Sequence, residues 1–211
     1  MENIIEFSPD GDSIWMDFHS MLDGLLYQDY FSEEIDGREI RRHPMRPGKY
    51  LYTYGSLLIE AGRAGEAVEP LERLVSLDPV CPAYLFELGE AYKRTGRLQE
   101  AFDASAWALS CASSEAEMAR CYRNMAFCLS ETAQYEEAVL LCRLSLRFQP
   151  SSSAEAELAW IARKTGTPPQ TYTDRELTAQ WEQRGYPMEL SEAVVKNQKL
   201  LEGVFGEKGE R

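Results

Sequence analysis

Apolar residues recur at three- and four-residue steps along most of this chain, which is the spacing of amphipathic helices. The first such face follows Asp12, a candidate N-cap, and it contains Ile14, Trp15, Phe18, Met21, Leu22, Leu25 and Leu26. A second short helix is predicted from about 32 to 42, and Pro44 ends it. Residues 1–47 are therefore interpreted as an acidic N-terminal segment and a degenerate helical hairpin (12–47) that caps one end of the structure.

A longer pattern recurs in the middle of the chain. Residues 88–101 read LGEAYKRTGRLQEA, and residues 54–67 read YGSLLIEAGRAGEA. Gly89 therefore aligns with Gly55 at an interval of 34 residues (89 − 55). Each glycine is predicted to remove a side chain where two helices of a hairpin touch.

A Glu-Ala pair shows that the period changes once. The pair ends at Ala67, Ala101 and Ala138, so the second interval is 37 residues (138 − 101). An insertion of three residues is expected near 113–117, where Ser114 and Glu117 have the spacing of a capping box. The third unit is therefore predicted to begin with a longer helix.

This pattern resembles the tetratricopeptide repeat, in which Leu-Gly, Tyr and Ala recur at fixed offsets. The matching residues are Leu85, Leu88, Gly89, Tyr92, Gly96 and Ala101. The resemblance implies three repeats of two helices each, at 48–81, 82–115 and 119–152. It also implies an all-α, tetratricopeptide-like helical-hairpin solenoid with capping helices at both ends, in which Ala101 lies at the closest helix crossing of the second repeat.

Three more helices are predicted after the third repeat. The first two run from about 152 to 164 and from 174 to 184, with Leu177 and Trp181 facing inward. The last begins at Ser191, and its apolar face can pack behind Trp181 at the end of the solenoid or fold into the concave face in place of a ligand. The short turn before it favours the first arrangement. Residues 153–211 are therefore interpreted as a degenerate fourth repeat and a capping helix.

The composition of the chain excludes some classes of function. The 211 residues include 35 acidic and 22 basic side chains, and a net charge of −13 argues against nucleic-acid binding. Residues 1–37 contain ten acidic residues and no Lys or Arg, whereas 38–49 contain five basic ones. These charges are interpreted as exposed to solvent, or alternatively as two patches of opposite sign that steer a partner toward the protein. No apolar run reaches the roughly 20 residues that span a bilayer. With no basic N-terminal signal, the protein is interpreted as cytoplasmic and not bound to membranes.

Recognisable catalytic chemistry is missing from the sequence. Its two histidines, His19 and His43, have no acid at ligand spacing, and no phosphate-binding glycine loop is present. Nothing marks a buried pair of carboxylates. The five cysteines are interpreted as small buried residues in helix packing. We therefore expect no catalytic residue, no cofactor and no metal.

The resemblance implies a binding surface instead, because the first helix of each repeat lines a concave groove in that family. The positions carried over for partner binding are Tyr52, Phe86, Glu87, Glu90, Arg120, Arg123, Asn124 and Phe127, beside Lys49, Ile59, Lys93, Glu157 and Ile161. The aromatic residues are predicted to be exposed anchors, and Arg120, Arg123 and Asn124 to hold a carboxylate or a peptide backbone. Phe86, Arg123 and Phe127 are expected to share one surface.

These residues predict a non-catalytic scaffold that binds a peptide or protein segment. Two alternatives stay open: a chaperone-like or regulatory subunit for one dedicated partner, including a second copy of the chain, and an enzyme or regulator in which the repeats are accessory. Members that hold the C-terminal carboxylate of heat-shock chaperones have Lys, Asn or Arg where this chain has Tyr52, Ser56, Glu87, Arg120 and Asn124. Only Arg120 is basic, so that function is not expected.

Overall fold

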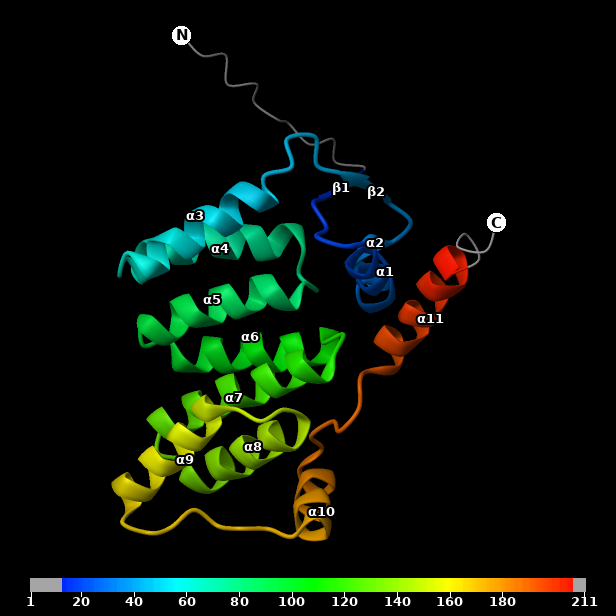
Figure 1. Ribbon diagram of the computed structural model, residues 1–211. Coiled ribbons are helices and arrows are strands. Elements are labelled where there is room, and N and C mark those ends of the chain that lie inside the picture. The colour runs from blue at the N-terminus through cyan, green and yellow to red at the C-terminus, as the bar shows by residue number, and fades with distance from the viewer. Residues whose placement is uncertain (1–12, 207–211) are drawn as a thin grey trace.

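The computed structural model describes residues 13–206, so the predicted N-cap at Asp12 and the acidic residues before it lie outside the described part. Within this range the chain forms eleven helices and two short strands. The helices α3 to α9 stack in one column, and the elements near the two ends of the chain lie beside that column (Figure 1). The all-α solenoid predicted from the sequence is confirmed as the architecture of the molecule.

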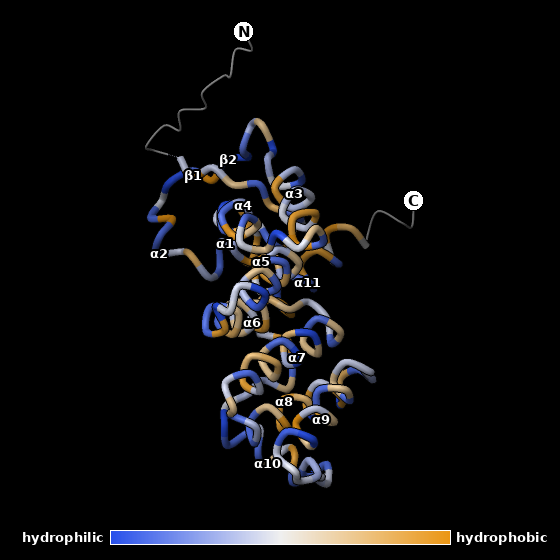
Figure 2. Tube along the Cα trace, turned by 90° about the vertical axis from the view of Figure 1, so that its left-hand side faces the viewer, coloured by the Kyte–Doolittle hydropathy of each residue, from blue (hydrophilic) through white to orange (hydrophobic). Residues whose placement is uncertain are grey.

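Three helical hairpins form the centre of the stack. Their helices are α3 (Gly48–Glu60), α4 (Ala64–Leu77), α5 (Pro82–Arg94), α6 (Leu98–Cys111), α7 (Glu115–Glu131) and α8 (Tyr135–Phe148). The predicted ranges 48–81 and 82–115 each hold one hairpin, whereas the third hairpin begins at Glu115, before the predicted start of its repeat at 119. α7 is the longest of the six and begins at Ser114, whose hydroxyl accepts the Glu117 backbone N–H, as the three-residue insertion predicted. Apolar and polar segments alternate along the stacked helices (Figure 2).

Backbone conformation explains the tight turns inside the hairpins. Gly62 and Gly96 have φ angles of 75° and 77°, a region that glycine adopts without steric cost. Ala133 takes the same place in the third hairpin with φ 62°. Glycine is also needed at Gly55, because a Cβ there would lie 2.5 Å from Cδ2 of Leu71.

The N-terminal part differs from the predicted helical hairpin. Residues of strand β1 (Ser13–Met16) pair in parallel with β2 (Glu39–Arg42), and between them lie α1 (Met21–Tyr30) and α2 (Ser32–Ile35). Helix α1 begins at Ser20, which forms a capping box with Asp23. Asp36 and Gly37 both have positive φ angles and end α2. The predictions of one helical face from Ile14 and of a helix reaching 42 were therefore wrong, because these local stop and start signals outweigh the apolar spacing.

The C-terminal part contains α9 (Ser152–Thr165), α10 (Asp174–Arg184) and α11 (Glu192–Gly206). The bounds of α10 are those predicted, Leu177 and Trp181 are buried as expected, and Gly185 ends the helix in the left-handed conformation. α9 continues the stack on α7 and α8, whereas α10 packs against α8. The Arg184 guanidinium holds α10 there through an ion pair with Glu137 at 2.8 Å.

The last helix occupies neither of its predicted positions. α11 packs against α1, and Val194 is fully buried in a cluster with Met16, Leu26 and Tyr27. Figure 1 shows α11 beside α1 and away from α10. We call residues 13–42 and 192–206 the terminal clasp. Both predicted places for α11 were wrong, because the chain after α10 runs back along the repeats to the N-terminal segment.

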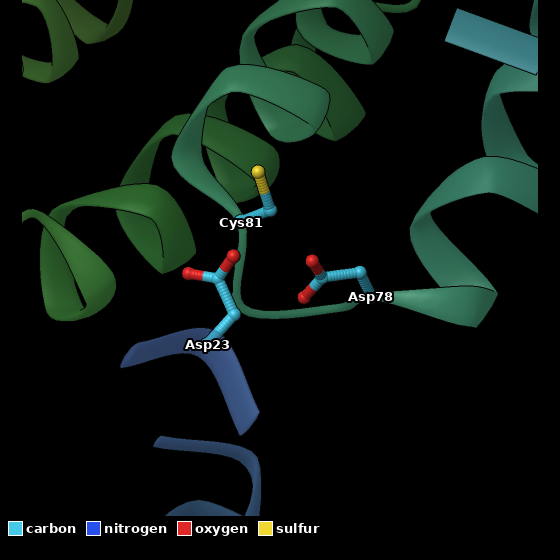
Figure 3. Close-up of side chains that lie close together, drawn as sticks. All are labelled: Asp23, Asp78 and Cys81. Carbon is cyan, nitrogen blue, oxygen red and sulfur yellow. The ribbon is translucent and has the colours of Figure 1, made fainter. Parts of the chain in front are cut away.

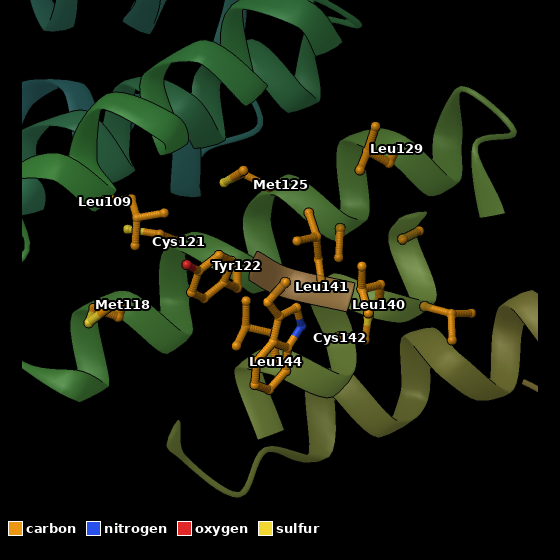
Figure 4. Packing of buried hydrophobic residues seen from close by; sticks show 14 of the residues in the cluster. Leu109, Met118, Cys121, Tyr122, Met125, Leu129, Leu140, Leu141, Cys142 and Leu144 are labelled. Atoms are coloured by element: carbon orange, nitrogen blue, oxygen red, sulfur yellow. The ribbon is translucent and has the colours of Figure 1, made fainter. Parts of the chain in front are cut away.

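The core follows the stack. The largest cluster of buried side chains joins α5 to α10, and Figure 4 shows its centre around Tyr122, Leu140, Leu141 and Leu144. All five cysteines are buried and none forms a disulfide, so the prediction that they are buried is confirmed. No helix among the described residues is long and apolar enough to cross a membrane.

Candidate peptide-binding groove

The first helices of the hairpins form one face of the solenoid. α3, α5, α7 and α9 each contact the next first helix in the array. Between α5, α7 and α9 this face holds a cavity of about 340 Å³, which we call the groove pocket. Its lining residues are Lys93, Arg120, Arg123, Asn124, Phe127, Cys142, Ser153, Ala154 and Glu157. Most binding positions predicted in the second and third repeats thus surround one cavity.

Two arginines, Arg120 and Arg123, line the groove pocket together with the carboxylate of Glu157. The Arg123 guanidinium donates to the hydroxyl of Ser145 at 3.1 Å, and that of Arg120 lies 4.3 Å from the ring centroid of Phe86. Neither arginine has a carboxylate within ion-pair distance among residues 13–206. Burial, and then the positive charge of Arg120, lowers the pKa of Arg123. An anionic group in this pocket would therefore relieve the repulsion between two poorly compensated cations.

Lys93 is already neutralised within the same pocket. Its ammonium group pairs with Glu90 at 2.7 Å, donates to Oδ1 of Asn124 at 3.2 Å and lies 5.4 Å from the ring centroid of Phe127. Against the effect of burial, the hydrogen bonds from Lys93 and Arg94 hold the pKa of Glu90 below its ordinary value. These contacts fix the orientation of the pocket wall. The other charged groups of the pocket are Arg120, Arg123 and the carboxylate of Glu157, which accepts a hydrogen bond from Ser130.

A second cavity of about 730 Å³ lies between the terminal clasp and helices α3 and α5, and we call it the aromatic pocket. Its lining residues are Asp17, Phe18, His19, Met45, Arg46, Lys49, Tyr50, Tyr52, Ala83 and Tyr84. The rings of Tyr52 and Tyr84 lie 5.5 Å apart, and the ring of His19 lies 5.6 Å from Tyr84. The Oδ1 atom of Asp17 accepts from Arg46 at 3.2 Å. The sequence pattern predicted Tyr52 and Lys49 and missed the remaining lining, because the clasp supplies part of it.

Phe86 and Glu87 do not line either pocket, although both were predicted to bind the partner. Phe86 is only 3% exposed, so the prediction of an exposed aromatic anchor at this position was wrong. The side chain of Arg120, which comes from the next repeat, covers its ring. Phe127 lines the groove pocket and is half-buried, whereas Glu87 lies outside both pockets and accepts a hydrogen bond from Ser56 at 3.0 Å. Arg123 and Phe127 therefore share one surface, and Phe86 packs beneath it.

Comparison with known proteins agrees with this architecture. Residues 48–81 match the family model of the tetratricopeptide repeat. A search of curated protein sequences finds no match. Among solved structures, the chain is similar to the first tetratricopeptide domain of Spaghetti (RPAP3) bound to the HSP90 peptide SRMEEVD. That alignment has 20% identity and a TM-score of 0.51, and it covers 58% of this chain and 95% of that one.

Two further structures share the fold. The Sgt2 tetratricopeptide domain from Aspergillus fumigatus is 17% identical with a TM-score of 0.51, over 60% of this chain and 88% of that one. MamA is 14% identical with a TM-score of 0.52, over 86% of this chain and 96% of that one. Sequence identities this low show that the fold is shared, and they do not show a shared function. Residues 48–81 are thus a recognised tetratricopeptide repeat, and the stacked helical hairpins give the chain the fold of tetratricopeptide-repeat proteins.

Proposed function

We propose that this protein is a non-catalytic scaffold that holds a peptide or protein segment on the face formed by α3, α5, α7 and α9. The observation that carries the proposal is the pair of arginines in the groove pocket, Arg120 and Arg123, which lack a carboxylate partner among the described residues of an otherwise acidic protein. A carboxylate from the partner would form charge-assisted hydrogen bonds with them.

The charges along this face favour an acidic side chain within the bound segment over a C-terminal carboxylate. The resemblance to the tetratricopeptide repeat implies that Ser56 and Glu87, which are hydrogen-bonded to each other, stand at positions that bind the terminal carboxylate in chaperone-binding members. A negative charge there would repel such a group. Arg120 and Arg123 lie further along the array, on α7.

Selection of binding peptides tests the proposal. A display library of random peptides, selected on the purified protein, should yield sequences that contain Asp or Glu. Arg123→Gln should bind a selected peptide about 10-fold more weakly, the equivalent of one charged hydrogen bond of at least about 1.4 kcal/mol. Arg175→Gln, an exposed change on α10, is the matched control and should bind normally. Equal affinities of all three proteins, or selection of peptides without acidic residues, would contradict the proposal.

A second function, self-association, is favoured by one apolar surface. Helix α3 exposes Tyr50, Tyr54 and Leu57 at 74%, 55% and 56%, and Tyr50 lies at the edge of this surface, where it also lines the aromatic pocket. Such a face at the end of a solenoid suits an isologous contact with the same face of a second copy. Light scattering coupled to size exclusion should then show a concentration-dependent dimer that Leu57→Glu abolishes. A monomer at every concentration would exclude this function.

A further inference from the structure

One cluster of potential metal ligands lies outside both pockets among the described residues. It consists of Asp23 on α1, Asp78 just after α4 and Cys81 just before α5. One ligand atom from each residue lies within 4.8 Å of the other two, and all three residues are buried. Figure 3 shows the three side chains close together between the clasp and the repeats, with the carboxyl groups of Asp23 and Asp78 side by side below Cys81. No sequence pattern indicated this cluster, because its residues come together only when the clasp docks.

Backbone groups hold both carboxylates in place. One oxygen of Asp23 accepts the N–H of Ser20 at 2.8 Å, and Oδ2 of Asp78 accepts the N–H of His19 at 2.7 Å. The second oxygen of Asp78, Oδ1, has no hydrogen-bond donor although the residue is fully buried. A buried oxygen of this kind needs an electropositive partner, which is either a proton shared with the neighbouring carboxyl group of Asp23 or a bound cation.

The charges of the cluster also call for a counter-charge. Burial, and next the charge of Asp23, raises the pKa of Asp78 to about 8. Burial likewise raises the pKa values of Asp23 and of the Cys81 thiol. No Lys or Arg side chain forms an ion pair with either carboxylate among residues 13–206. Two adjacent buried carboxylates therefore need either a shared proton or a metal cation.

We propose that Asp23, Asp78 and Cys81 form a binding site for one Zn²⁺ ion that ties the terminal clasp to the first two repeats. The thiol selects this cation, because thiolate and carboxylate together suit Zn²⁺, whereas Mg²⁺ and Ca²⁺ take oxygen ligands. Binding replaces the protons of the cluster by the ion and releases them to solvent. Since Phe18 and His19 precede α1 and line the aromatic pocket, the ion also fixes one wall of that pocket.

Metal titration of the full-length protein tests the site. After treatment with a chelator, calorimetric titration should show one Zn²⁺ per chain, with proton release and a higher thermal midpoint. Cd²⁺ should produce the ultraviolet absorption of a metal–thiolate bond in the unmodified protein, which is a readout independent of any substitution. Cys81→Ser and Asp78→Asn should each weaken Zn²⁺ binding by at least about 10- to 100-fold, the range reported for groups that only support ligands.

Cys142→Ser is the matched control, because Cys142 is equally buried but lies in the large core cluster away from the site. It should retain stoichiometric Zn²⁺ binding. The proposal is overturned if the unmodified protein shows no metal–thiolate absorption and no stabilisation by stoichiometric Zn²⁺. It is also overturned if Cys81→Ser binds Zn²⁺ as tightly as Cys142→Ser does. In either case the two carboxyl groups share a proton instead.

Discussion

The repeats and the terminal clasp are stabilised by contacts of different range along the chain. In residues 48–148, each helix packs mainly against the helices just before and after it. In the clasp, the hydroxyl of Tyr30 lies 2.8 Å from that of Ser191, which is 161 residues away, and Lys196 pairs with Asp29 across 167 residues. Neighbour contacts let each repeat form next to the previous one, whereas the clasp requires both ends of the chain to meet.

Because of this difference, the shape of one binding cavity depends on the docking of the clasp and the shape of the other does not. The groove pocket belongs entirely to α5, α7, α8 and α9, so its shape depends on local packing. The aromatic pocket depends on Phe18 and His19 and therefore on docking of the clasp. Closing a loop of this length has a conformational entropy cost that only the clasp contacts oppose. A change at the C-terminus can thus alter one binding cavity and leave the other intact.

The largest effect is expected from the removal of α11, which tests whether the clasp and the repeats unfold separately. Deleting residues 192–211 exposes the face of α1 that contains Leu26 and Tyr27, so the clasp should open while the repeats stay folded. Hydrogen exchange should show at least about 10-fold faster exchange in α1, equivalent to about 1.4 kcal/mol, with protection in α5 to α8 unchanged. Loss of protection throughout the repeats would show that the clasp and the solenoid form one cooperative unit.

The next test removes the side chain that closes the other end of the core. Trp181 is fully buried, and the Arg147 guanidinium lies 5.6 Å from its ring. Trp181→Ala should lower the free energy of unfolding by about 3–5 kcal/mol, measured by urea denaturation. Trp181→Phe should cost clearly less, because it keeps an aromatic ring and removes an indole N–H that has no acceptor. A loss below about 1 kcal/mol for Trp181→Ala would mean that α10 does not contribute to the continuous core.

The sequence predicts the repeats better than it predicts the terminal clasp. The bounds of α10 and the longer α7 were predicted, because caps, glycines and apolar spacing act within a few residues. The strand at Ser13–Met16 was not, because a short apolar run fits either a helix or a strand until its partner at Glu39–Arg42 is known. The place of α11 was missed for the same reason, since its apolar face does not specify which surface will cover it.

The candidate site shows this limit within the repeats as well. Arg120, Arg123, Asn124 and Phe127 lie on one helix, so their common surface could be predicted from helical spacing. The burial of Phe86 could not, because its cover is a side chain of the next repeat. The cluster of Asp23, Asp78 and Cys81 could not be predicted either, because its residues are far apart in the sequence and come together only in the folded chain.

Two glycines at equivalent repeat positions test how alike the repeats are. A Cβ at Gly55 would lie 2.5 Å from a buried Leu71 atom, whereas one at Gly89 would lie 3.8 Å from the carbonyl oxygen of Ala101, an ordinary contact. Gly55→Ala should lose stability, since overpacking costs about 1–3 kcal/mol and the gain in helix propensity is at most about 1 kcal/mol. Gly89→Ala should gain up to about 1 kcal/mol. Thermal unfolding distinguishes the two variants, and midpoint shifts of the same sign would contradict this difference in packing.

The smallest effect is expected from the exposed charge pair of the clasp. The Lys196 ammonium lies 2.8 Å from one oxygen of Asp29 and 2.9 Å from the other, but its side chain is 65% exposed. Lys196→Ala should therefore cost less than about 1 kcal/mol, and the difference should shrink in 1 M salt.

Asp29 makes the pH dependence of this pair testable. The hydrogen bond from Lys196 is the main cause that lowers the pKa of Asp29 below 3.8, so the stabilisation is present above that pH and is lost on further acidification. Unfolding curves of the unmodified protein and of Lys196→Ala should therefore differ at neutral pH and converge below the folded-state pKa. The buried neighbour Asn197 donates to the same carboxylate at 2.7 Å, and Asn197→Ala should cost more than Lys196→Ala at every pH. The reverse order would mean that charge, and not the buried hydrogen bond, holds the two ends of the chain together.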